Sequence, residues 1–176
     1  MGPQRSLRRS GGPLRARLAV LLLACIPVAA VAEDCPPTGR DESAAIVRRW
    51  HEDVINDRDP AALQEILGAS VTHHAAGGYP DSMDPAEVAT MMDDFLAAFP
   101  DLQITIDDLI VENDKVVERY TASGTQTGPL GELSATGRSA TWTGINIFRI
   151  ACGRIAEVWS EVDALARSRQ LLGDMP

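Results

Sequence analysis

The spacing of the apolar residues changes at Pro100, and this change sets the class of fold. Before Pro100, apolar side chains recur at the spacing of an α-helix, as in segments 43–56 and 85–99. From Leu102 to Ile110 they alternate with polar residues, which is the pattern of a half-buried β-strand. A chain whose helices come first and whose strands follow as a group is typical of the α+β class.

Local signals divide the chain into elements. Asp59-Pro60, Asp84-Pro85 and Asp163 each have the form of a helix start. Tight turns at 112–115 and 151–154 join strands in antiparallel pairs. We expect one curved antiparallel sheet, with strands near 70–74, 102–110, 116–127, 139–150 and 155–162, wrapped by three to four helices.

The first 32 residues have the layout of a secretory signal peptide. Five arginines and no acidic residue precede an apolar run that ends in the cleavage motif Ala30-Val31-Ala32. This run is shorter than the ~20 residues of a membrane-spanning helix. Cys25 in a lipoprotein signal and Arg8-Arg9 in a twin-arginine signal are alternative routes of export. We therefore predict a secreted or periplasmic protein whose mature chain begins at Glu33.

The mature chain is acidic and has the length of one domain. Residues 33–42 contain two prolines and a glycine and are predicted to be a linker, while residues 43–173 form the domain. Cleavage leaves 11 Lys and Arg against 25 Asp and Glu, a net charge of about −14. This charge argues against nucleic acid and anionic membrane surfaces as partners.

Two cysteines remain after cleavage, Cys35 in the linker and Cys152 in the turn between the last two strands. Two thiols in an oxidising compartment favour a disulfide. The sequence leaves open whether the two cysteines meet.

Six stretches fit one family pattern in their order and spacing: Val-Thr-His-His (71–74), Phe-Pro-Asp-Leu (99–102), Gly-Thr-Gln-Thr-Gly (124–128), Thr-Gly-Arg (136–138), the segment 144–163, and Gln-Leu-Leu-Gly (170–173). Through them the chain resembles the SnoaL-like polyketide cyclase (ester cyclase) family from about Ser43 to Gly173. The resemblance implies the cone-shaped α+β barrel shared with ketosteroid isomerase and scytalone dehydratase, usually a homodimer, with a mostly apolar pocket inside the cone.

The resemblance also implies a chemistry. The cyclases of this family close a ring by an intramolecular aldol step without metal or organic cofactor, and an aspartate near the end of the last strand acts as general acid and base. Aligning Gly153-Arg154-Ile155 with the family turn puts Ser160 at that aspartate and Asn146 at a family histidine. A serine with no adjacent base cannot remove a proton from carbon. The fold is therefore implied more firmly than the mechanism.

His73, Glu161 and Asp163 are candidates to replace the missing aspartate. Glu161 and Asp163 flank Ser160, and either supplies a carboxylate if a bulge re-aims the strand. Alternatively, Glu161 faces solvent and Asp163 caps the last helix. Of His73 and His74, only one can face the pocket, because adjacent side chains on a strand point in opposite directions. For the same reason the two histidines form no metal pair, and no metal site is predicted.

The pocket walls are predicted from strand parity. Trp142, Asn146 and Phe148 share one face of the long strand, and Ser160 lies across the hairpin from them. Trp159 belongs to the family signature but has the opposite parity to Ser160, so its direction stays open. Substrate-binding roles are predicted for Tyr79, Met92, Trp142, Asn146, Phe148 and Trp159, with core packing as the alternative for the methionine.

Three functional hypotheses follow for the exported domain. It is an enzyme of cofactor-independent proton transfer (cyclisation, isomerisation or dehydration), a small-molecule binding protein that has lost the catalytic aspartate, or an interaction domain whose cavity is filled by side chains. For the first two, the ligand is a small, largely apolar, oxygenated molecule such as a polyketide-like compound or a cyclic ketone.

Overall fold

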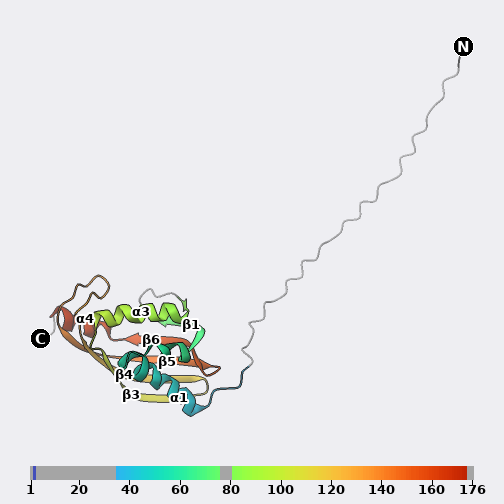
Figure 1. The fold of residues 1–176 in the computed structure, drawn as a ribbon, viewed down its shortest axis with the longest axis horizontal. Helices are drawn as coiled ribbons and strands as arrows, with labels where there is room; N and C mark the ends of the chain where they lie inside the picture. Colours follow the sequence, from blue (N-terminus) through green and yellow to red (C-terminus); the bar gives the residue numbers. More distant parts are fainter. Residues whose placement is uncertain (1, 3–34, 76–80, 174–176) are drawn as a thin grey trace. The chain divides into compact units, whose positions relative to one another are not determined.

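The computed structural model describes residues 2, 35–75 and 81–173, and Figure 1 shows how the elements are arranged. Within these residues the elements are, in chain order, α1 (Arg40–Arg49), the π-helical η1 (Trp50–Asn56), α2 (Pro60–Ile66), β1 (Leu67–Ala75), β2 (Ser82–Met83), α3 (Pro85–Ala98), β3 (Gln103–Glu112), β4 (Lys115–Thr125), β5 (Ser139–Ala151), β6 (Arg154–Val162) and α4 (Ala164–Leu172). The predicted α+β class is confirmed.

The helices begin and end where the sequence signals lie. The side chain of Asp59 accepts a hydrogen bond from the second residue of α2, which has Pro60 at its first position. Asp84 and Glu87 form a reciprocal capping box at the start of α3. The side chain of Asp163 caps α4. No helix in the described ranges is long and apolar enough to cross a membrane.

The six strands form one open, curved sheet in the order β2-β1-β6-β5-β4-β3. Four of its five pairings are antiparallel, as predicted. The fifth, between β1 and β6, is parallel, with His73 opposite Val158 and Ala75 opposite Ser160. The sequence predicts antiparallel pairing throughout because hairpin turns are its only signal of direction. α3 and four strands separate β1 from β6 along the chain, so no hairpin constrains this pair.

The inner face of the sheet packs against η1 and α3. On β4 and β5 the buried side chains alternate regularly with exposed or half-buried ones. The inward set includes Glu118 and Tyr120 from β4, and Trp142, Asn146 and Phe148 from β5. Contacts of Glu118 with His51 of η1, and of Trp142 with Phe95 of α3, join this face to the helical layer.

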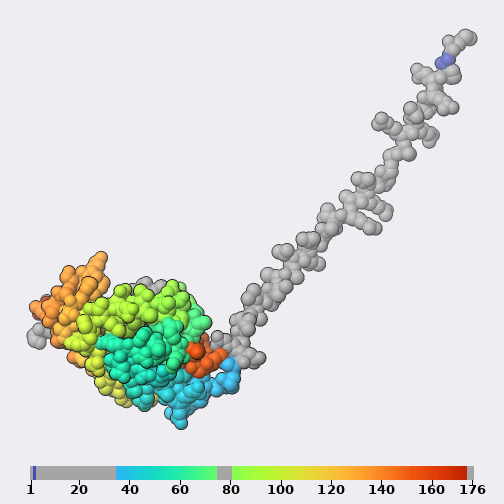
Figure 2. Space-filling model, viewed as in Figure 1, coloured from blue at the N-terminus to red at the C-terminus, as the bar shows by residue number. Residues whose placement is uncertain are grey.

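A disulfide fixes the start of the domain to the turn between β5 and β6. Cys35 and Cys152 are bonded, with their Cα atoms 5.5 Å apart. The amide of Gly153 also donates to Thr38 Oγ1 at 2.9 Å. Figure 2 shows the blue surface that follows Cys35 beside the orange-red surface of this turn. The structure thus answers the question that the sequence leaves open about the two cysteines.

Candidate functional site

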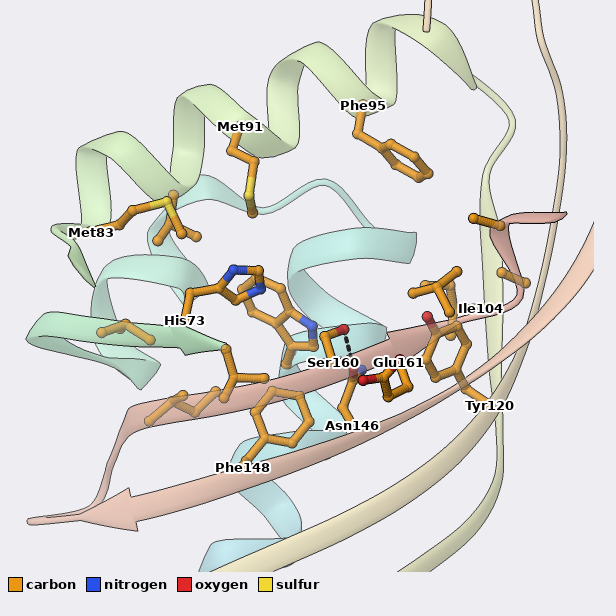
Figure 3. A pocket seen from close by; sticks show the side chains of 18 of the residues that line it. His73, Met83, Met91, Phe95, Ile104, Tyr120, Asn146, Phe148, Ser160 and Glu161 are labelled. Carbon is orange, nitrogen blue, oxygen red and sulfur yellow. Dashed lines mark hydrogen bonds between the residues drawn. The ribbon is translucent and has the colours of Figure 1, made fainter. Parts of the chain in front are cut away.

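The inner face of the sheet and α3 enclose a cavity of about 380 Å³. Figure 3 shows Met91 and Phe95 of α3 facing the sheet residues across this space. Most of the lining is apolar. Four of its polar side chains, His73, Tyr120, Asn146 and Ser160, enter from β1, β4, β5 and β6. An apolar cavity with a few converging polar groups is the usual form of a small-molecule site.

His73 faces the cavity, and its neighbour His74 lies on the other side of the sheet. The ring of His74 stacks on Trp159 with centroids 4.8 Å apart, and its Nε2 lies 2.7 Å from Glu157 Oε1. His73 lines the cavity and is half-buried. Burial, followed by the nearby His74, lowers the pKa of His73 below its ordinary value. His73 is therefore a neutral imidazole at pH 7 and can accept a proton.

A hydrogen-bonded chain runs from the cavity wall into the core. Ser160 Oγ donates to Asn146 Oδ1 at 2.5 Å, as Figure 3 shows, and Asn146 Nδ2 donates to Glu118 Oε1 at 2.7 Å. His51 Nε2 lies 2.6 Å from the same Glu118 oxygen. Ser160 and Asn146, the two positions that depart from the family pattern, therefore contact each other directly.

The inner end of this chain is fully enclosed. The exposed fractions of Glu118 and His51 are 0% and 1%. Glu118 Oε2 and His51 Nδ1 have no hydrogen-bond partner among the described residues. Burying a carboxylate is costly unless it is paired, so the contacts with His51 and Asn146 stabilise Glu118 at this position.

Tyr120 lines the cavity wall beside the hydrogen-bonded chain of Ser160, Asn146 and Glu118. Burial, and secondly the charge of Glu118, raise the pKa of Tyr120 to about 12, so the phenol stays protonated at pH 7. Its ring lies against Gly144 of β5. A Cβ at position 144 would be 2.4 Å from the Tyr120 hydroxyl oxygen, so only glycine leaves room for the ring.

The carboxylates predicted to replace the aspartate lie at the margin of the site or outside it. β5 and β6 pair regularly from Phe148–Val158 to Gly144–Val162, and their one irregularity is next to the turn, so no bulge re-aims this end of β6. Glu161 lines the cavity, but its side chain is exposed to solvent. Asp163 is exposed and caps α4 by accepting from Ala166 N.

The predicted substrate-binding residues divide into three groups. Trp142, Asn146 and Phe148 line the cavity, as their shared parity predicts. Trp159 and Met92 are not among the lining residues. Trp159 stacks on His74 because its parity is opposite to that of Ser160, and Met92 is buried in the core while Met91 lines the cavity. Tyr79 lies outside the described residues.

Sequence reasoning missed His51, Glu118 and Arg167. Glu118 lies at an inward position of β4, between Val116 and Tyr120, and a charged residue at such a position is a signal of a buried polar network. His51 follows Trp50 in the apolar stripe of the first helix. Arg167 lines the cavity, with its guanidinium 5.2 Å from the ring of Trp142 and 5.6 Å from that of Phe95.

Within residues 35–75 and 81–173, no group of three or more His, Cys, Asp or Glu side chains is placed to hold a metal ion. We assign no residue as a metal ligand.

The chain is similar to proteins of one family. The family model for SnoaL-like polyketide cyclases matches residues 45–171. TsrD from Streptomyces laurentii is 30% identical with a TM-score of 0.67, over 76% of this chain and 97% of that one. A SnoaL-like polyketide cyclase from Agrobacterium tumefaciens is 20% identical with a TM-score of 0.63, over 73% and 97%.

AclR from Streptomyces galilaeus, a proposed hydroxylase, is 23% identical with a TM-score of 0.66, over 78% of this chain and 85% of that one. Its likeness and that of the Agrobacterium protein concern the fold alone. None of the curated proteins compared with the chain matches it.

Proposed function

This chain belongs to the SnoaL-like polyketide cyclase family, and from that premise we propose that it binds a small, largely apolar, oxygenated molecule and carries out cofactor-independent proton transfer on it. The substrate class is a polyketide-like compound or a cyclic ketone. The observation that carries the proposal is a neutral His73 in the wall of an apolar cavity.

His73 takes the role of general base in this proposal. A base must reach the proton that it removes and be unprotonated at the working pH. His73 lines the cavity, and its lowered pKa keeps it neutral at pH 7. The proton that it takes from a carbon next to a carbonyl returns to another atom of the same substrate. Such a cyclisation or isomerisation therefore needs no external oxidant or reductant.

A second candidate function is binding without catalysis. Ser160 occupies the position of the family aspartate, and its hydroxyl proton is engaged by Asn146. In this alternative the cavity retains a ligand and His73 only hydrogen-bonds to it. Both functions require a ligand in the same cavity and differ in whether a proton is exchanged.

The proposal also includes export and a homodimer. Export is proposed from the layout of residues 1–32. The homodimer is proposed because proteins of this family usually form one.

Tryptophan fluorescence tests the binding step. We expect cyclic ketones and polyketide-like phenols to perturb the emission of the mature protein, because Trp142 lines the cavity. Replacing Trp142 by Phe should reduce the ligand-dependent change. The matched control is Trp159→Phe, which removes a tryptophan stacked on His74 outside the cavity lining and should preserve the change. Binding in the cavity is refuted if no compound of the panel alters the emission.

A further inference from the structure

We propose that Ser160 accepts, rather than donates, the hydrogen bond that it makes to a ligand. The cavity then selects molecules that present a hydroxyl group at this point, such as a phenol or an enol, over ketones of the same shape. This inference rests on the proposed binding function and narrows its ligand class.

The donors and acceptors along the hydrogen-bonded chain can be assigned starting from Glu118. Asn146 Nδ2 donates to Glu118 Oε1 at 2.7 Å, so the amide nitrogen of Asn146 faces the carboxyl group of Glu118. The other end of the amide, Oδ1, is then directed to Ser160 and can only accept.

Ser160 has a single hydroxyl proton, and this proton is used at Asn146 Oδ1. Its two lone pairs remain available on an oxygen that belongs to the cavity wall. A ligand hydroxyl can donate to this oxygen. A ketone oxygen at the same place would meet another acceptor with no proton between them.

The orientation of the Asn146 amide is held by the enclosure of Glu118. Turning the amide would bring Oδ1 against a carboxyl oxygen of Glu118 at hydrogen-bond distance, and Glu118 would lose the donor that Asn146 supplies. Because Glu118 and Asn146 are 0% and 7% exposed, water cannot replace that donor without opening the core. Glu118 and Asn146 are thus positioning residues for Ser160.

The same direction favours the enol over the keto form of one compound. An enol presents O–H to Ser160, whereas its keto tautomer presents only an acceptor. A polyketide-like 1,3-dicarbonyl segment, which enolises readily, meets both the apolar lining and this requirement. The site therefore suits compounds whose enol is already populated.

Calorimetric titration of the mature protein with two bicyclic probes, 2-naphthol and 2-tetralone, tests the inference. For the wild type we expect 2-naphthol to bind about tenfold more tightly, the value of one hydrogen bond. Replacing Ser160 by Ala should weaken 2-naphthol to the level of 2-tetralone and leave 2-tetralone unchanged. Ser139→Ala, an exposed serine on β5 that bonds to Thr125, is the matched control and should preserve the preference.

A second variant tests the direction of the chain itself. Asn146→Leu removes the acceptor of the Ser160 proton, so the hydroxyl can turn and donate to a ketone. We expect 2-tetralone to bind more tightly to this variant than to the wild type, whereas a purely structural defect would weaken both probes together. If the Asn146→Leu variant does not fold, the inference is tested by the Ser160→Ala variant alone, in which the preference for 2-naphthol should be lost.

The outcomes separate this inference from the proposed function. Equal affinity of the wild type for the two probes, or tighter binding of 2-tetralone, would overturn the selection of donors while binding in the cavity stands. Failure of the wild type to bind either probe would refute the binding function and, with it, the inference.

Discussion

At the scale of single residues, the chemistry of the cavity depends on the environment of each polar group. Ser160, which stands where the resemblance implies the catalytic aspartate, donates a hydrogen bond to Asn146. The phenol of Tyr120 has a raised pKa and stays protonated at pH 7. Among the residues that the structure describes, only His73 combines a lowered pKa with a place in the cavity wall. A base at pH 7 is therefore expected at His73.

Exchange of α-protons measures this function directly. With a cyclic ketone such as 1-tetralone in D₂O, we expect the protein to accelerate deuterium incorporation, followed by NMR. His73→Ala should lower the exchange rate by about 100-fold or more, the usual contribution of a general base, while binding changes little. His74→Ala, measured on the plateau of the pH profile, is the matched control, because His74 lies on the other side of the sheet and its effect on the pKa of His73 no longer matters there. Equal rates for wild type and His73→Ala would contradict the assignment.

The pH dependence of exchange has a definite sign. The base works only as neutral imidazole, so the rate rises with pH as His73 loses its proton. Because burial lowers the pKa of His73, the midpoint of this rise should lie below about pH 6.5, the ordinary histidine value. An inflection above pH 7 would assign the titration to another group.

Strand parity explains how much of the site could be predicted at this scale. It places Trp142, Asn146 and Phe148 together on β5 and opposite Ser160, because alternation in a regular strand is strict. It could not decide between His73 and His74, since parity shows that the two side chains point in opposite directions but not which one faces the cavity. Nor could it separate Met91, which lines the cavity, from Met92, because adjacent residues on a helix differ in direction by about 100° and the phase of α3 depends on its tertiary contacts.

At the scale of elements, caps and turns could be predicted and long-range pairings could not. Asp59, Asp84 and Asp163 start helices through contacts within three residues, which a sequence contains completely. The parallel pairing of β1 with β6 joins residues far apart in the chain, such as His74 and Glu157, separated by 83 positions. Such pairs are selected by the packing of the whole domain, which local patterns do not contain.

The disulfide belongs to this scale, because it joins the linker to the turn between β5 and β6. It closes a loop of 117 positions, for which the chain-entropy model gives a stabilisation of about 4 to 5 kcal/mol. We expect a reductant to lower the free energy of unfolding of the mature protein, measured by urea denaturation, by several kcal/mol. The Cys35→Ala/Cys152→Ala variant should have the lower stability already and should not respond to reductant. Two alkylated thiols in the unreduced wild-type protein would exclude the bond.

At the scale of the whole molecule, the acidic domain is expected to work outside the cytoplasm. The bond between Cys35 and Cys152 is of the kind that persists in oxidising compartments, which agrees with the predicted export. The resemblance of residues 43–173 to one family implies the class of fold without any information on tertiary contacts. It leaves the chemistry open, because the resemblance implies that Ser160 stands at the position of the catalytic aspartate and Asn146 at that of a frequent family histidine.

N-terminal sequencing of the protein from its native host tests export. The arginine-rich start, the apolar run and Ala30-Val31-Ala32 predict a mature chain that begins at Glu33 and is found outside the cytoplasm. Replacing Ala30 and Ala32 by bulky residues should block cleavage and leave a longer chain. Recovery of an intact chain beginning at Met1 from the cytoplasm would refute the prediction.

The parallel pairing of β1 with β6 also has a consequence for the order in which the molecule assembles. β3 to β6 follow one another along the chain and are adjacent in the sheet, so they can pair early at a low entropic cost. β1 joins β6 across a long connection and carries His73. We therefore expect a late intermediate that has most of its core but an incomplete wall at the cavity, and pulsed hydrogen exchange should show β1 amides protected after those of β4 and β5. Simultaneous protection would mean that the protein and its site form in a single step.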